Sequence, residues 1–133
     1  MSELLPPVDE TTAPWWEGTR EGWFLLQRCH ACAAVQFPPR SVCVTCMAAE
    51  PEWFEASGHA RVDSFTVVHR SPAPEQIEAP YVVARVVLEE GPIVLSRLVG
   101  DDVDAWRCDD PVSLHWEPLA DGRRLPVFGR VPR

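Results

Sequence analysis

Four cysteines occur in two C-x-x-C pairs, and this spacing is typical of a metal site. The first pair is Cys29 and Cys32, and residues 33–42 separate it from the second pair, Cys43 and Cys46. Two residues between thiolates let a tight turn direct both sulfurs at one ion, and two such turns complete the tetrahedron that structural zinc prefers. Because four protein ligands leave no position for water, the pattern predicts a structural zinc site and not a catalytic one.

Other uses of four thiolates remain open at the level of the residues. Disulfides or a redox dithiol are one alternative, and an iron–sulfur or single-iron centre is another. Met1 to Glu10 has neither the basic start nor the apolar region of a signal peptide, so we expect a cytoplasmic protein. A reducing cytoplasm favours metal over disulfides, and nothing else in the sequence resembles an electron carrier.

The remaining cysteine and the histidines do not form an evident catalytic group. Cys108 follows Trp106 closely and is predicted to be a buried core thiol, and His30 is predicted to be a surface residue inside the first C-x-x-C turn. No serine or cysteine has an evident histidine and acid partner, and no glycine-rich phosphate loop or paired-carboxylate motif stands out. The sequence therefore favours a binding or scaffold protein without catalytic residues of its own.

The charge balance argues against a nucleic-acid partner. The chain has 20 acidic and 12 basic residues and a formal net charge of -8. Affinity for nucleic acid comes largely from neutralising phosphates with Lys and Arg, so this composition disfavours it. The end of the chain is locally basic, and its arginines are either solvated charges or contacts for the phosphates of a coenzyme: Arg123, Arg124, Arg130 and Arg133.

A tryptophan-rich segment, residues 1–26, precedes the cysteines and is predicted to contain a short helix. Thr11 or Thr12 could cap it and Pro14 suits its first turn, while two glycines weaken it. The apolar side of this helix would carry Trp15, Trp16 and Trp23. Either the helix folds back on its own domain, or it docks on a partner, because Trp is enriched in interface hot spots.

Residues 27–55 form the cysteine module, and residues 56–133 read as a β domain. Three strands are predicted within 58–70, 81–90 and 92–100, with a hairpin turn at Glu90-Gly91. A short helix is predicted over 101–106, followed by two strands on either side of Asp121-Gly122. Five strands with a helix between the third and fourth is the element order of an OB-fold barrel. The predicted fold is thus mainly β: a helix, a rubredoxin-like zinc ribbon and a five-stranded barrel.

These features together resemble the family called domain of unknown function 35, in which a zinc ribbon precedes an OB-fold. The family's W-E-G-x-R-E-G pattern is matched at residues 16–22, its R-C-x-x-C turn at 28–32 and its P-P-R-x-x-C-x-x-C segment at 38–46. Residues 64–70 and 125–128 are similar to its first and last barrel strands. One departure is Ala33, where the family commonly has glycine after the second ligand, and an alanine there would strain a turn that needs a positive φ.

The resemblance implies an accessory subunit for a thiolase-fold acyl-CoA enzyme, and a hetero-oligomer. It favours a lipid-transfer-protein-like aldolase of steroid catabolism, a lyase that cleaves a side-chain β-hydroxyacyl-CoA to a ketone and propionyl-CoA, with a MaoC-type hydratase as a possible further partner. The alternatives are a scaffold bridging a thiolase and a hydroxymethylglutaryl-CoA synthase, and a single-stranded nucleic-acid-binding OB-fold protein. On this basis partner contacts are expected at Trp15, Trp16, Trp23, Pro39 and Arg40, with acyl-CoA at the shared interface.

Overall fold

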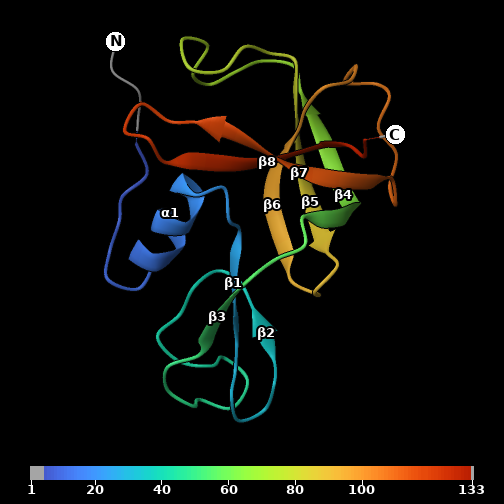
Figure 1. Cartoon of the computed structure of the whole chain (residues 1–133). Coiled ribbons are helices and arrows are strands. Elements are labelled where there is room, and N and C mark those ends of the chain that lie inside the picture. Colours follow the sequence, from blue (N-terminus) through green and yellow to red (C-terminus); the bar gives the residue numbers. More distant parts are fainter. Residues whose placement is uncertain (1–4, 133) are drawn as a thin grey trace.

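One helix, a small sheet and a closed barrel make up the described part of the chain (Figure 1). The structure, a computed structural model, describes residues 5–132. Residues 1–4 of the predicted helical segment, and Arg133, lie outside the described residues. No helix in residues 5–132 is long and apolar enough to cross a membrane.

The helix α1 spans Ala13–Arg20, with Pro14 in its first turn as predicted. Thr12 is the N-cap residue, but its side chain makes no cap; Thr12 Oγ1 instead accepts a hydrogen bond from Asp9 N–H at 3.1 Å. The helix ends before Gly22, whose φ of +80° is a conformation that glycine adopts at low cost. Trp23 therefore lies beyond the helix, and its predicted place on one side of the helix with the other two tryptophans is wrong.

Below the helix in Figure 1, three strands form the ribbon sheet. They are β1 (Leu25–Arg28), β2 (Val35–Gln36) and β3 (Glu52–Glu55), arranged antiparallel in the order β2-β1-β3. The strand β1 begins at Leu25, so the predicted boundary between residues 26 and 27 falls inside it. Both neighbours of β1 are short, and the long loop between β2 and β3 carries the second cysteine pair.

The remaining five strands close into a barrel. They are β4 (His59–Val68), β5 (Tyr81–Leu88), β6 (Ile93–Leu98), β7 (Pro111–Pro118) and β8 (Arg124–Arg130), in the order β4-β5-β6-β8-β7, with β7 returning to β4. Their alternating inward residues, such as Val62, Val82, Val86 and Phe128, are buried. This arrangement confirms the predicted mainly β fold with a five-stranded OB-type barrel.

The predicted short helix over 101–106 is absent, because side chains hold this segment in turns. Trp106 is 1% exposed in the core, and the Arg130 guanidinium lies 4.0 Å above its ring. The same guanidinium binds the carboxylates of Asp101 and Asp110, each at 2.9 Å. These contacts fix both ends of the segment, and Asp101 also accepts a hydrogen bond from the next backbone N–H, which competes with helix formation. Cys108 is exposed here, so its predicted burial is wrong.

Candidate metal centre

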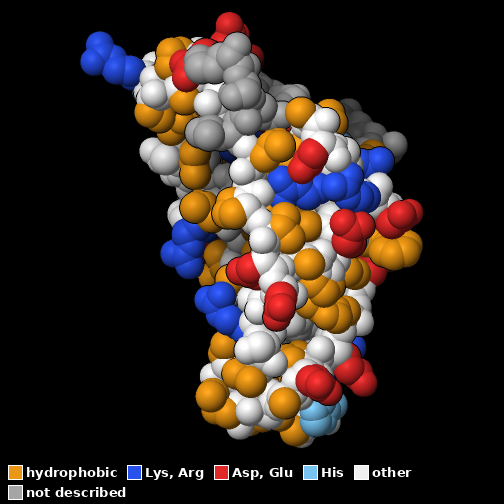
Figure 2. Space-filling model, turned by 90° about the vertical axis from the view of Figure 1, so that its left-hand side faces the viewer, with side chains coloured by type: hydrophobic (Ala, Val, Ile, Leu, Met, Phe, Trp, Pro, Cys, Tyr) orange, Lys and Arg blue, Asp and Glu red, His pale blue; other side chains and the backbone are white. Residues whose placement is uncertain are grey.

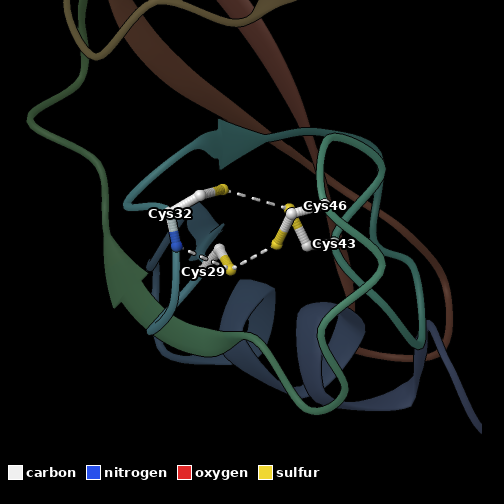
Figure 3. Close-up of side chains that lie close together, drawn as sticks. All are labelled: Cys29, Cys32, Cys43 and Cys46. Carbon is white, nitrogen blue, oxygen red and sulfur yellow. Dashed lines mark hydrogen bonds between the residues drawn. The ribbon is translucent and has the colours of Figure 1, made fainter.

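The four cysteines of the two C-x-x-C pairs converge at the end of the ribbon (Figure 3). Their Sγ atoms all lie within 4.8 Å of one another, with 3.5 Å between Cys29 and Cys46 and 3.6 Å between Cys32 and Cys43. Zinc–sulfur bonds of about 2.3 Å in a tetrahedron place the sulfurs about 3.8 Å apart. All four thiols are free, so the donor set, its number and its spacing fit structural zinc.

Each pair of ligands sits on the same kind of backbone turn. Ala33 N–H donates to Cys29 C=O at 3.0 Å, and Met47 N–H donates to Cys43 C=O at 2.9 Å. The residue after each second ligand has a positive φ, 65° at Ala33 and 69° at Met47. The strain expected at Ala33 is therefore real, and it recurs at Met47, which sequence reasoning missed. Each cysteine turn thus contains one residue in an unfavourable backbone conformation. Metal binding by the adjacent cysteines offsets the cost of these two conformations.

Backbone N–H groups inside the turns favour the metal-binding form of two ligands. The N–H groups of Ala31 and Cys32 point at Cys29 Sγ from 3.3 and 3.4 Å. The backbone N–H of Cys46, followed by other donors, lowers the pKa of the Cys43 thiol to about 6 in spite of its burial. The pKa of Cys29 is lowered in the same way, chiefly by the backbone N–H of Cys32. Since the thiolate is the form that binds metal, these donors prepare Cys29 and Cys43 for a cation, whereas burial and the neighbouring thiols raise the pKa of Cys32 and Cys46 in the absence of an ion.

Two buried glutamines hold the second turn in place, and the sequence analysis did not single them out. Gln27 and Gln36 face each other across β1 and β2 and are 3% and 7% exposed. Gln27 exchanges two hydrogen bonds with the backbone of Arg40, at 2.8 and 2.9 Å. Gln36 donates to Gln27 at 2.8 Å and accepts from Val44 N–H at 2.9 Å, next to the ligand Cys43. The sequence feature that could have identified them is a glutamine next to apolar residues in each of these two short strands.

His30 is exposed, as predicted, and does not belong to the ligand cluster. Its Nε2 lies 3.0 Å from the carbonyl oxygen of Ala49, so it links the first turn to the loop that carries the second. Hydrophobic side chains also cover the ribbon end of the molecule, at the bottom of Figure 2. Among them Val44 and Met47 are 59% and 70% exposed. Part of the surface around the second cysteine turn is thus apolar, beside acidic side chains and a histidine.

The structure separates the three N-terminal tryptophans that were grouped as candidate partner contacts. Trp15 and Trp16 are 6% and 9% exposed and belong to this chain's own core, whereas Trp23 is 47% exposed. Pro39 is buried and Arg40 is exposed in the loop that leads to Cys43. The ring of Trp15 packs edge-on against Trp16 and Phe24. The helix therefore folds back on its own chain, and Trp23 is the tryptophan of the three that remains free to meet a partner.

The candidate coenzyme-contacting arginines also differ in their surroundings. Arg123 is 4% exposed, binds the Asp121 carboxylate at 2.6 Å and lies 4.5 Å above the Trp16 ring, so it is not a solvated charge. Arg130 is held by the two aspartates of the 101–110 segment. Arg124 is half-buried and has no ion pair among the described residues. Arg133 lies outside them.

Comparison with known proteins agrees with both halves of this structure. Residues 16–52 match the rubredoxin-like zinc ribbon domain of ChsH2, and residues 53–117 match the C-terminal OB-fold domain of ChsH2. The chain belongs to the ChsH2 family of DUF35 proteins. In this family's zinc ribbon the four converging cysteines hold structural zinc, which confirms the predicted cofactor.

Several relatives of this DUF35 chain are longer proteins. A probable enoyl-CoA hydratase alpha subunit of Thermomonospora curvata is 36% identical over 123 residues, which is 92% of this chain and 38% of that protein. A DUF35 domain-containing scaffold protein of Methanocaldococcus jannaschii is 37% identical over 67% of this chain and 62% of its own length. The chain thus spans less than two thirds of the length of each of these relatives.

Two further similar proteins are named as part of a thiolase and of an aldolase. The benzoylsuccinyl-CoA thiolase subunit BbsA of Geobacter metallireducens is 32% identical over 76% of this chain and 67% of its own length. The solved structure of the Ltp2-ChsH2(DUF35) aldolase contains a chain that is 35% identical. The two chains superpose with a TM-score of 0.86, over 95% of this chain and 98% of that one.

Proposed function

We propose that this DUF35 chain is an accessory subunit that binds and stabilises a thiolase-fold acyl-CoA enzyme. The observation that carries the proposal is its match, over almost the full length of both chains, to the DUF35 chain of the Ltp2-ChsH2 aldolase. The metal centre supports a structural role, because its four ligands all come from the protein and leave no position for a substrate.

The partner we propose is an aldolase, and the reaction is a retro-aldol cleavage of a steroid side-chain β-hydroxyacyl-CoA. The carbon–carbon bond between the α and β carbons breaks, the β-hydroxyl becomes the carbonyl of a ketone, and the α carbon takes a proton to leave propionyl-CoA. The aldolase supplies the acid and the base, and the DUF35 chain helps to shape the tunnel for the CoA thioester. A hydratase partner is supported by the hydratase-subunit name of the longer relative.

Three positions on this chain are proposed to face the partner or the coenzyme. Trp23 offers a half-exposed aromatic ring of the kind that dominates interface energetics. Arg40 is presented by a loop that Pro39 and the two glutamines hold rigid. Arg124 is the arginine of the last barrel strand that has no ion pair among the described residues, so it is the one we propose for a CoA phosphate.

A second candidate is a scaffold that bridges a thiolase and a hydroxymethylglutaryl-CoA synthase. The scaffold name of the archaeal relative favours it, as does the thiolase-subunit name of the Geobacter relative. The two candidates predict different chemistry in the complex. Thiolysis of a β-ketoacyl-CoA consumes free CoA, whereas retro-aldol cleavage of a β-hydroxyacyl-CoA does not.

The test is to purify the tagged chain from its native cells, identify captured proteins by mass spectrometry, and assay the complex. We expect a thiolase-fold protein in stoichiometric amount, and cleavage of β-hydroxyacyl-CoA in the absence of free CoA. Cleavage that requires free CoA would favour the thiolase complex. Recovery of no thiolase-fold protein under gentle conditions would contradict the accessory role.

A further inference from the structure

The barrel is closed by its weakest pairing where β6 and β8 meet. β6 pairs with β5 along its whole length, from Val87↔Ile93 to Val82↔Leu98. It pairs with β8 at one position only, Leu98↔Phe128. From this crossing β6 and β8 diverge, and α1 lies in the angle between them (Figure 1). We call the opening between residues 93–97 and 124–127 the β6–β8 seam.

Part of the β6 edge that faces this seam has no strand partner. In an antiparallel ladder, successive residues turn their backbone groups toward opposite edges. Val99 N–H, just after β6, donates to Phe128 C=O at 2.9 Å, so Arg97 and Leu95, two and four residues earlier, turn their N–H and C=O groups to the same side. No described strand pairs with Leu95 on that side. The opposite wall offers Pro126, which lacks an N–H, and the Ser96 hydroxyl donates to the Pro126 carbonyl at 2.8 Å.

An apolar groove of about 420 Å³ runs along the seam. Its walls include Trp15 of α1, Phe37 and Pro38 of the ribbon, and Leu125 of β8, so all three parts of the chain contribute. Leu95 stands at the groove with 73% of its surface exposed. The groove thus combines aromatic walls with the unpaired strand edge at Leu95.

These features match an extended polypeptide better than a purely apolar ligand. An acyl chain would fill the groove but cover the edge of β6 at Leu95 without pairing it, and unpaired buried polar groups are costly. An extended peptide supplies a carbonyl and an N–H at every residue, and strand addition to a free edge uses both. Its alternate side chains would point into the groove and away from it.

We propose that the β6–β8 seam binds an extended segment of a partner protein, which adds to the free edge of β6 at Leu95 and places an apolar side chain in the groove against Trp15 and Phe37. The inference rests on the proposed function only for the identity of that partner. It predicts a segment with apolar residues at alternating positions. It also predicts that the Leu95 amide exchanges freely with solvent in the isolated chain.

The first measurement is amide hydrogen exchange by NMR on the full-length, zinc-loaded chain. In the free chain we expect the Leu95 amide to exchange much faster than that of Val94, which faces β5. The probe is a displayed library of random nine-residue peptides, and we expect selected peptides to alternate apolar and polar residues and to slow exchange at Leu95. Equal protection of Leu95 and Val94 in the free chain, or a library without seam-binding peptides, overturns the proposal.

The matched variants are Leu95→Pro and Leu95→Ala. Proline removes the N–H that would donate to the peptide and is tolerated at strand edges whose N–H faces outward, whereas alanine keeps the N–H. We expect Leu95→Pro to weaken peptide binding about tenfold, as for the loss of one hydrogen bond, and Leu95→Ala to weaken it less. A selected peptide methylated at alternate backbone nitrogens makes the same test on the unchanged protein. Strand addition is contradicted if the methylated peptide binds as tightly as its unmethylated form and if Leu95→Pro binds the peptide as tightly as Leu95→Ala.

The same measurement separates this inference from the proposed function. If a thiolase-fold protein is captured but the Leu95 amide exchanges equally fast in the complex, the seam proposal fails and the accessory role stands. If peptides bind at the seam but no thiolase-fold protein is captured, the accessory role fails and the seam stands.

Discussion

At the scale of single residues, the metal centre depends on a few atoms placed by backbone turns. Cys43 is fully buried, its sulfur lies 3.6 Å from that of Cys32, and a backbone N–H lowers its pKa. Cys108 is also a free thiol, but it is exposed and lies outside the ligand cluster. Replacing Cys43 removes a metal ligand, whereas replacing Cys108 removes a thiol that is not a ligand. The two substitutions therefore form a matched pair.

We expect Cys43→Ser to lose most of the bound zinc and the structure of the ribbon, because zinc binding contributes about 10 kcal/mol or more to the folding of such modules. Metal content measured by inductively coupled plasma mass spectrometry, together with circular dichroism, tests this. Cys108→Ser should keep about one zinc per chain. Full metal content in Cys43→Ser would show that this thiol is not a ligand.

The strained turn residue gives a second prediction at this scale. Ala33 has a φ of 65°, which costs a non-glycine residue about 1–2 kcal/mol, whereas glycine pays about 0.5–1 kcal/mol in chain entropy. Ala33→Gly is therefore expected to stabilise the ribbon by about 0.5 kcal/mol in urea unfolding. Ala34→Gly, without a positive φ to relieve, should destabilise it. The opposite order of the two variants would contradict the strain argument.

At the scale of the elements, side chains rather than long strands hold the connecting segments. The ribbon's strand β2 has only Val35–Gln36, yet the loop after it is fixed by four hydrogen bonds of the glutamine pair to backbone groups. The 101–110 segment is fixed by Arg130 in a similar way. In both cases, side chains that are distant in the sequence hydrogen-bond to an irregular segment and hold it in place.

Removing the first of these two sets of hydrogen bonds should weaken the metal site without touching a ligand. Gln27→Leu removes the partner of the buried Gln36 amide and of the part-buried Arg40 backbone groups, so we expect a loss of about 1–3 kcal/mol in unfolding free energy and about 10–100-fold in zinc affinity. Urea unfolding and competition with a zinc chelator measure the two effects. Gln76→Leu, in an exposed loop, is the control. Unchanged zinc affinity in Gln27→Leu would mean that the glutamines do not position Cys43.

The second set of hydrogen bonds should make stability depend on pH. The pKa of Asp110 lies below its ordinary value, chiefly because Arg107 N–H donates to it and also because Arg130 binds it. A carboxyl with a depressed folded pKa stabilises the protein above its unfolded pKa of about 3.9, and this contribution is lost as the pH falls through the folded value.

We therefore expect Asp110→Asn to melt a few degrees below the wild type at pH 7, as for a loss of about 1 kcal/mol. The difference should shrink below about pH 4, where the wild-type carboxyl takes up its proton. Thermal melts between pH 7 and pH 2 test this, with Asp104→Asn on the exposed side of the same segment as control. A difference in melting temperature that does not change with pH would exclude the charge as the cause.

At the scale of the whole molecule, one aromatic cluster joins helix, ribbon and barrel. Phe24 lies between Trp15 of α1, Phe37 after β2 and Trp116 of β7, with ring centroids 5.5, 5.1 and 6.5 Å away. The indole N–H of Trp116 also donates to Gly22 C=O at 3.2 Å. The three parts therefore share a core, and a change in this cluster acts on all of them.

Two tryptophans separate the stability of this core from partner binding. Trp15→Ala should cost about 3–5 kcal/mol in unfolding free energy, because it leaves a cavity among aromatic rings. Trp23→Ala should change stability by no more than about 0.5 kcal/mol but weaken binding to the proposed partner about tenfold or more. Urea unfolding and titration calorimetry with the captured partner measure these effects. Unchanged affinity in Trp23→Ala would remove this residue from the interface.

The sequence by itself determined the features that depend on local spacing. The C-x-x-C pairs identify the zinc ligands, period-two alternation identifies the barrel strands, and Glu90-Gly91 and Asp121-Gly122 mark turns, because each pattern acts within a few residues. Together with the family motifs they were enough for the fold and the metal.

Only the tertiary structure decided which side chains are buried and which edges stay open. Trp15 and Trp23 look alike in sequence, but the end of α1 before Gly22 turns one into the core and leaves the other exposed. Arg123 is buried and Cys108 exposed because of what packs beside them, and the β6–β8 seam exists because two strands far apart in the chain cross at one point. Burial and pairing are set by contacts across space, and no local pattern records them.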